Sequence, residues 1–255
     1  MTAAGVEVVA RGASVRGPRG PVFEGVDLDV PAGGLLAAHG PAGSGRTSLL
    51  LALAGRMRLS GGAIRVGGHV LPAEGRRVRR LVAVARAAPA VDLEGRLRVR
   101  EVMAERCLTS PGVTERRIRQ AFETLDLASR GADLVEDLGP ADGLLLATAL
   151  ALAEQPGALV VDDVDDGLPP DAHQFVWEAL HRVQDNGPTV PAGCLRPPPP
   201  PPPPPPASPS CSAWCRCCTA PCTSGRTGIR TARPTACRSP SSTRTTWRMR
   251  NRAAG

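Results

Sequence analysis

The chain of 255 residues contains no tyrosine and no lysine, and only three phenylalanines and three tryptophans. All 31 of its basic residues are therefore arginines. Arginine and alanine codons are rich in G and C, whereas lysine and tyrosine codons are rich in A and T, so this composition indicates a GC-rich genome. Such a bias favours arginine at positions where lysine is usual, although a GC-rich genome still encodes lysine where it is needed.

The chain also lacks a long apolar run and a framework of cysteines. Its longest apolar stretch, residues 144–153, has about half of the roughly 20 residues that a transmembrane helix needs. Before residue 197 the only cysteines are Cys107 and Cys194, which excludes a disulfide-rich fold. The segment GVEVVARG near the start carries a glutamate and does not have the pattern of a secretory signal. We therefore expect a soluble, cytoplasmic protein.

Acidic residues are missing from the last part of the chain. From Pro197 to the end there are nine arginines and no aspartate or glutamate. This segment contributes +9 to a net charge of +7, so residues 1–196 carry −2. A mildly acidic body lacks the basic surface by which proteins bind nucleic acids, so we expect no nucleic-acid partner for it.

The last part of the chain has a different composition from the rest. Ten consecutive prolines begin at Pro197, and no leucine, valine or phenylalanine follows them. So little apolar surface cannot offset the entropy of ordering, which predicts a disordered tail over residues 197–255. A proline run is also a cytosine-rich tract, where reading-frame slips occur easily. The tail is therefore either the product of a frameshift or a genuine low-complexity segment, whose arginines would then suit a nucleic acid.

The first part of the body alternates strand patterns with one helix pattern. Residues 5–13 and 22–30 alternate apolar and polar side chains, which predicts half-buried strands. Residues 35–39 are a short apolar strand that leads into a glycine-rich loop, and 46–57 form a helix that ends near a glycine. Residues 60–72 predict another strand with glycine turns.

The second part of the body is mainly helical. Residues 99–108, 114–127 and 143–157 have helical patterns, and 158–163 predict a buried strand that ends in acidic residues. A helix over 169–188 follows. Strands that alternate with helices around a glycine loop predict an α/β fold with a largely parallel central sheet. The arginine-rich segment RRVRR near residue 78 is expected to be a solvated loop rather than a contact with lipid or nucleic acid.

The glycine-rich loop GPAGSGRTS is typical of a phosphate-binding loop. In the pattern G-x-x-x-x-G-K-[ST], Gly40, Gly45 and Thr47 fit, whereas Arg46 stands where the lysine belongs. Glycines let backbone N–H groups converge on phosphate oxygens, and the following helix N-terminus adds positive potential. The candidate nucleotide-binding residues are Gly40, Pro41, Ala42, Gly43, Ser44, Gly45, Arg46, Thr47 and Ser48, and the Thr47 hydroxyl is a candidate Mg²⁺ ligand.

A second motif, LVVDD, ends in two acidic residues at the end of the predicted buried strand. Such a run is typical of the Walker B strand of phosphate-loop NTPases, whose aspartate holds Mg²⁺ through water. Asp162 has this place, and Asp163 follows it. The alternative is an ordinary buried strand that meets a polar turn.

Together with GVDLDVPAGG, SGGAIRVGGHVLP, LRVREVM and ALALAEQPGALVVDD, these motifs resemble the nucleotide-binding domain of ATP-binding cassette (ABC) proteins, from about Gly5 to Cys194. The resemblance implies a phosphate-loop NTPase fold over residues 1–196, with an ABC-type core sheet, a helical subdomain at about 95–145 and a truncated C-terminal end. It further implies ATP and Mg²⁺ as ligands. A transmembrane transporter subunit and a second nucleotide-binding domain, identical or different, are the implied partners at the inner face of the cell membrane.

The departures from the family pattern fall on its catalytic positions. The LSGGQ signature falls on LGPAD at 138–142, where a proline lacks the backbone N–H that could meet phosphate. The Q-loop glutamine falls near Arg86, and the aromatic residue that stacks on adenine falls near Gly17. The catalytic glutamate is replaced by Asp163, one methylene shorter, and the switch histidine is missing near Cys194–Leu195.

Arg46 belongs to the same set of departures. Arginine keeps the positive charge, but its planar fork is larger than an ammonium group and can misplace the γ-phosphate. The resemblance, with these departures, implies nucleotide binding at reduced affinity and weak or absent hydrolysis, with Asp163 as the residue that positions water. The alternative is a non-hydrolysing, nucleotide-responsive scaffold of the same fold.

Overall fold

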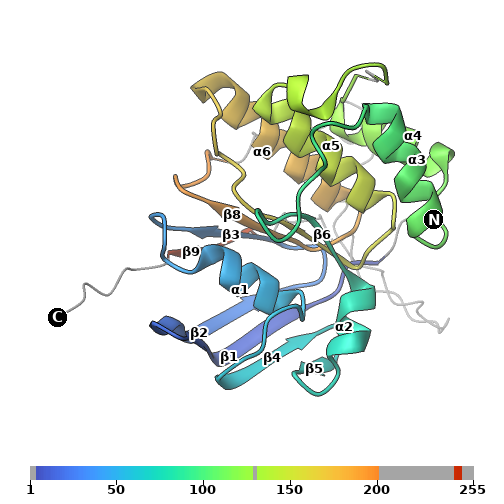
Figure 1. Ribbon diagram of the computed structural model, residues 1–255. Coiled ribbons are helices and arrows are strands. Elements are labelled where there is room, and N and C mark those ends of the chain that lie inside the picture. The colour runs from blue at the N-terminus through green and yellow to red at the C-terminus, as the bar shows by residue number, and fades with distance from the viewer. Residues whose placement is uncertain (1–3, 129–130, 201–243, 249–255) are drawn as a thin grey trace, which may run out of the picture. The chain divides into compact units, whose positions relative to one another are not determined.

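The computed structural model describes residues 4–128, 131–200 and 244–248 (Figure 1). Most of the predicted disordered tail, with its cysteines, lies outside these residues. Residues 4–199 and 244–248 belong to one compact unit. Among the described residues, no helix is long and apolar enough to cross a membrane.

One sheet is antiparallel, with the order β2-β1-β4-β5. Its strands are β1 (Val8–Gly17), β2 (Gly20–Val30), β4 (Gly61–Val66) and β5 (His69–Leu71). Val26, Leu28 and Val30 are buried while their neighbours along β2 are exposed, as the alternation predicts. The strand predicted over 60–72 is two strands, because Gly67 and Gly68, both with positive φ, turn the chain between β4 and β5.

The second sheet is parallel and has the order β6-β7-β8-β3-β9. Its strands are β3 (Leu35–His39), β6 (Val82–Arg86), β7 (Ala158–Val161), β8 (Val190–Cys194) and β9 (Arg244–Arg248). The predictions of β3 and β7 are confirmed. No sequence signal marked β8, since Pro191 and Gly193 are unusual in a central strand, yet all five of its residues are buried.

Strand β9 lies in the segment for which the sequence predicts no structure. It pairs with β3 in parallel register, from Leu35 opposite Arg244 to His39 opposite Arg248. Pairing uses backbone groups that every residue except proline carries, and Thr and Trp are favoured in strands. The structure therefore has a strand at five residues for which the sequence predicts none.

The parallel sheet is covered on both faces (Figure 1). Alternate residues of β3 face opposite sides: Leu35 and Ala37 pack with α5 and α6, whereas Leu36 packs with α1 and the antiparallel sheet. The helices are α1 (Arg46–Leu53), α2 (Gly75–Leu81), α3 (Val99–Thr109), α4 (Glu115–Leu125), α5 (Pro140–Leu152) and α6 (Pro170–Asp185), with a short 3-10 helix at Val135–Asp137. The predicted α/β fold with a parallel central sheet is confirmed.

Helix α4 packs against α5, and α3 packs against α4, in the region where a helical subdomain is expected. In α4, Ile118, Phe122 and Leu125 form the buried face, and the Thr114 side chain caps the first turn. The arginine-rich segment near Val78 forms helix α2 instead of the expected loop, because Val78 is fully buried while the arginines beside it stay exposed.

Candidate nucleotide-binding site

The glycine-rich loop joins the carboxyl end of β3 to the start of α1. The Gly40 N–H donates to the Cys194 carbonyl at 3.3 Å, which ties the loop to β8. Gly43 and Gly45 have φ angles of 75° and 89°, which favour glycine. A Cβ on Gly45 would lie 2.7 Å from the Val22 carbonyl oxygen, so this position requires glycine for space as well as for conformation.

The first turn of α1 favours an anion. Arg46, Thr47 and Ser48 open the helix, and its first turn contains no acidic residue. Among the described residues no side chain caps the helix at Gly45. The N–H groups at a helix N-terminus have no partner within the helix and carry positive potential. They are therefore available to a phosphate group.

Arg46 is buried beside this turn. Its side chain is 8% exposed, and Nη2 lies 3.5 Å from Oδ1 of Asp163. Nη1 is buried and has no hydrogen-bond partner among the described residues. A buried charged donor without a partner costs free energy, so the site is suited to an anion that would complete the bonding of the guanidinium.

Asp162 follows β7 and is fully buried. Its backbone N–H donates to the Arg86 carbonyl at 2.9 Å, but neither carboxylate oxygen has a hydrogen-bond partner among the described residues. A Cβ on Gly193 would lie 2.0 Å from Oδ1, so the carboxylate fills the space over this glycine of β8. A buried carboxylate without donors is suited to a bound cation or water.

The sequence predicts Asp162 and the Thr47 hydroxyl as ligands of Mg²⁺. The described residues contain no group of three or more His, Cys, Asp or Glu side chains that could hold a metal alone. Mg²⁺ is commonly held by one or two protein oxygens together with substrate phosphates and water. Asp162 and the Thr47 hydroxyl are suited to this arrangement next to a phosphate loop.

Asp163 has a different environment from its neighbour. Its side chain is 26% exposed, and its backbone φ of 49° is in the left-handed region, which aspartate tolerates better than most residues. Burial, and then the charge of Asp162, raise the pKa of Asp163, while the Arg46 guanidinium opposes this shift. The two consecutive acids therefore differ in burial and in their charged neighbours.

A strand, a glycine loop with an N-terminal helix and a buried acid at the end of a neighbouring parallel strand are the parts of a phosphate-loop NTPase. The family model described as ABC transporter matches residues 23–165, more than half of the chain. The chain belongs to the ABC transporter family. Its fold is that of a nucleotide-binding domain, as the sequence motifs predict.

Relatives and solved structures agree with this assignment. The chain is 30% identical over 173 residues to Nod factor export ATP-binding protein I of Cupriavidus pinatubonensis, covering 66% of this chain and 52% of that protein. It is 31% identical over 180 residues to the daunorubicin/doxorubicin resistance ATP-binding protein DrrA of Streptomyces peucetius, covering 66% and 51%. The chain thus spans about half the length of the curated relatives it matches.

Two solved structures have the same fold. CbiO1 of Clostridium perfringens, part of the ABC transporter complex CbiONQ, has a TM-score of 0.64 at 17% identity, covering 74% of this chain and 78% of that one. The dimeric, post-hydrolysis ATP-binding cassette MJ0796 with bound ADP and Pi has a TM-score of 0.60 at 18% identity, covering 74% and 88%.

The structure brings some of the atypical family positions to the phosphate loop. Cys194, near which the resemblance implies a histidine, ends β8, and its carbonyl accepts a hydrogen bond from the Gly40 N–H, so Cys194 lies beside the loop. Arg86 ends β6 next to the Asp162 backbone, and its Nε lies 3.7 Å from Oδ1 of Asp92. Gly17 lies at the turn from β1 to β2 and has no side chain that could stack on a base.

The positions at which the resemblance implies the signature lie at the start of another helix, α5. Gly139 is the N-cap of α5, Pro140 its first residue and Asp142 the acidic residue of its first turn. Pro140 removes one N–H group from this helix end, and Asp142 adds a carboxylate to it.

Sequence reasoning did not identify the role of Asp165. Its buried carboxylate accepts hydrogen bonds from the N–H groups of Leu195 at 2.8 Å and Arg196 at 2.7 Å, which holds the chain where β8 ends. The only signal was a third acidic residue after the Walker B strand, and its partners are distant in the sequence.

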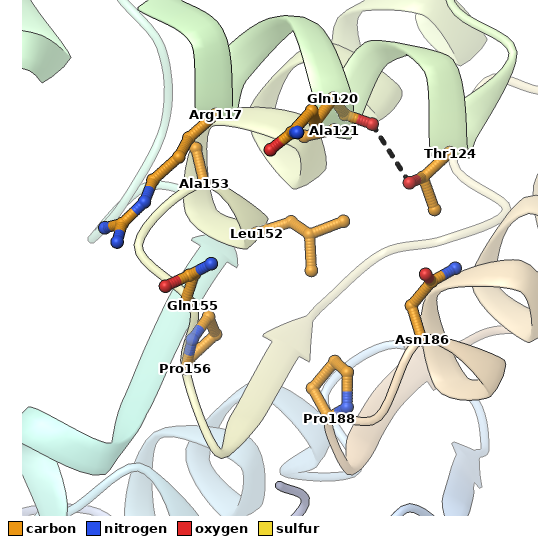
Figure 2. Close-up of a pocket in the computed structure, with 10 residues that line it drawn as sticks. All are labelled: Arg117, Gln120, Ala121, Thr124, Leu152, Ala153, Gln155, Pro156, Asn186 and Pro188. Carbon is orange, nitrogen blue, oxygen red and sulfur yellow. Dashed lines mark hydrogen bonds between the residues drawn. The ribbon is translucent and has the colours of Figure 1, made fainter. Parts of the chain in front are cut away.

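Figure 2 shows a separate pocket of about 250 Å³, lined by side chains that include Arg117, Gln155 and Asn186. It lies among α4, the connection from α5 to β7 and the connection from α6 to β8, where Thr124 Oγ1 donates to the Gln120 carbonyl at 3.0 Å. These connections precede β7 and β8, whereas the phosphate loop is at the carboxyl ends of the parallel strands. The pocket is therefore not part of the candidate nucleotide site.

Proposed function

We propose that this chain is an ATP-binding subunit of an ABC exporter, which binds Mg-ATP and couples binding or weak hydrolysis to a membrane partner. The observation that carries this proposal is that two buried groups have no hydrogen-bond partner among the described residues: Arg46 Nη1 at the start of α1 and the Asp162 carboxylate after β7. Nucleotide phosphates and Mg²⁺ supply the opposite charge for each.

In this proposal each residue has one task. The backbone N–H groups of residues 43–48 hold phosphate oxygens, and Arg46 adds a positive charge. Thr47 and Asp162 hold Mg²⁺, which neutralises charge on the phosphates when bound. Asp163 is the side chain available to position water, since it is adjacent to Asp162 and partly exposed.

Three features support weak hydrolysis. Asp163 is one methylene shorter than the glutamate that the resemblance implies at this position, which changes its reach toward water. Cys194 stands beside the loop where the family has its histidine, and Pro140 removes a backbone N–H from the start of α5. Loss of one positioned acid or base typically lowers a rate by about 10²–10⁴-fold, and several losses act on the same step here.

The names of the relatives support an export role. Both relatives described above are named as ATP-binding proteins of export or drug resistance. We propose that the chain works with a transmembrane subunit and a second nucleotide-binding domain, identical or different, at the inner face of the cell membrane.

The test measures binding and turnover on the same full-length protein. Calorimetric titration with ATP, once in the presence of Mg²⁺ and once in EDTA, gives the affinity for ATP. Release of phosphate at saturating ATP gives the rate of hydrolysis. We expect measurable binding, tighter with Mg²⁺, and a rate far below one turnover per second. Binding without any turnover favours the non-hydrolysing scaffold instead, and absence of binding contradicts both functions.

A further inference from the structure

Arg46 and Asp163 connect the phosphate loop to the end of β7. Arg46 begins α1, and Asp163 follows the buried Asp162, with 3.5 Å between Nη2 and Oδ1. The guanidinium is 8% exposed and the carboxylate 26% exposed, so the pair is only partly screened by water. Partly buried ion pairs are stronger than those on the surface.

The pair uses the only basic side chain of the loop. Residues 40–48 contain no other cation than Arg46. A phosphate group and Asp163 therefore compete for the same guanidinium. Nη1 of Arg46 has no hydrogen-bond partner among the described residues, so the Asp163 carboxylate does not use all the N–H donors of the guanidinium. A better anion can displace Asp163.

The left-handed backbone at Asp163 gives the two acids different positions. The Asp162 carboxylate lies over Gly193 of β8, while the Asp163 carboxylate contacts Arg46 of α1. Neutralising one acid therefore leaves the contacts of the other in place. Asp166, three residues on, is exposed and carries the same charge.

We propose that Asp163 is a latch on the phosphate loop: its carboxylate holds Arg46 in the nucleotide-free chain and releases it when phosphate binds. This inference rests on the proposed nucleotide site and assigns its regulation to one ion pair. Phosphate binds the state in which Arg46 is released, and only a fraction of the nucleotide-free protein is in that state. The free energy of the Arg46–Asp163 ion pair therefore reduces the observed free energy of nucleotide binding. Asp163 is then a positioning residue for Arg46 as well as the neighbour of the metal ligand.

The experiment measures the Kd of ADP by calorimetry on the full-length chain in EDTA, so that no metal contributes. We expect D163N to bind ADP about tenfold more tightly than wild type, an effect within the usual range of coupling between two sites. D166N is the matched control, since it removes one charge from the same segment without touching Arg46, and we expect a change of less than about twofold.

A second comparison separates the latch from simple repulsion. In an R46Q background the latch has no cation, so D163N should no longer change the Kd. Direct repulsion between the Asp163 carboxylate and phosphate would persist in the R46Q background. If D163N lowers the Kd of ADP as much in R46Q as in wild type, the latch is overturned. R46K is a second background in case R46Q does not fold, and the D163N effect should shrink in it because ammonium does not match the fork of the guanidinium.

The outcomes distinguish the latch from the proposed function. Measurable ADP binding to wild type with an unchanged Kd in D163N overturns the latch alone. Absence of ADP binding to both wild type and folded D163N contradicts the latch and the proposed function together.

Discussion

Two helix N-termini of this protein have opposite electrostatics. Helix α1 begins after Gly45 with a buried arginine and no acidic residue in its first turn. Helix α5 begins after Gly139 with Pro140, which lacks an N–H, and with Asp142 in its first turn. The geometry of a helix end is therefore not enough to bind an anion. The residues of the first turn also matter, and of these two helices α1 has those that suit a phosphate.

Replacing the glycine before each helix gives the largest expected difference. G45A puts a Cβ 2.7 Å from the Val22 carbonyl at a φ of 89°, and we expect it to lower the free energy of unfolding by about 1–3 kcal/mol. ADP binding should weaken by at least about tenfold, ~1.4 kcal/mol. A Cβ on Gly139 meets nothing within 4 Å, so G139A should cost less than about 1 kcal/mol. Denaturant unfolding and calorimetry measure both; equal effects would contradict the comparison.

Removing the metal ligand beside α1 should affect binding only when metal is present. We expect D162N to weaken binding of Mg-ADP by about 10–100-fold, the usual cost of altering a metal site. In EDTA its Kd should equal that of wild type or be slightly lower, because a buried negative charge is gone. An equal loss with and without Mg²⁺ would mean that Asp162 supports the loop rather than the metal.

Placing an acid in the first turn of α1 should make it behave like α5. S48D is expected to weaken ADP binding by about tenfold through repulsion of phosphate. It should also stabilise the nucleotide-free protein by about 0.3–1 kcal/mol, because a carboxylate suits a helix N-terminus. D142N, the matched change on α5, should leave the Kd of the isolated chain unchanged. An S48D protein that binds ADP as wild type does would show that phosphate does not contact this turn.

A histidine near a third helix N-terminus gives the smallest expected effect. Burial and the charge of Arg196 lower the pKa of His173 in α6 below its usual 6.5, against a smaller opposing effect of Asp165. In the window below 6.5 the unfolded chain then binds more protons than the folded one. Stability should therefore fall as the pH falls through this window and level off below the lowered pKa.

The H173Q variant provides the comparison for this pH effect. The glutamine that it introduces cannot take up a proton, so the unfolding midpoint of H173Q should depend less on pH between 6.5 and the lowered pKa than that of wild type. Trp177 Nε1 donates to His173 Nε2 at 3.1 Å, which fits a neutral ring, and a glutamine oxygen can accept in its place. Identical pH profiles would mean that His173 is as easily protonated in the folded chain as in the unfolded one.

Sequence patterns predicted the elements whose signals are local. The alternation in β2, the apolar runs of β3 and β7 and the helical spacing of Ile118, Phe122 and Leu125 identified these elements. The glycine loop and the acid after β7 identified the candidate site, because turn chemistry and strand ends are encoded over a few residues.

Only the tertiary structure decided how distant segments meet. In the folded chain the segment VPAGC is the central strand β8, and β9 pairs with β3. The Asp162 carboxylate lies over Gly193. The tertiary structure also paired Arg46 with Asp163, whereas the sequence predicted separate roles for these residues in binding phosphate and positioning water. The physical reason is that local periodicity and turn preferences depend on neighbours in the chain. Strand order, register and ion pairs depend instead on burial and backbone hydrogen bonds between segments that are far apart in the sequence.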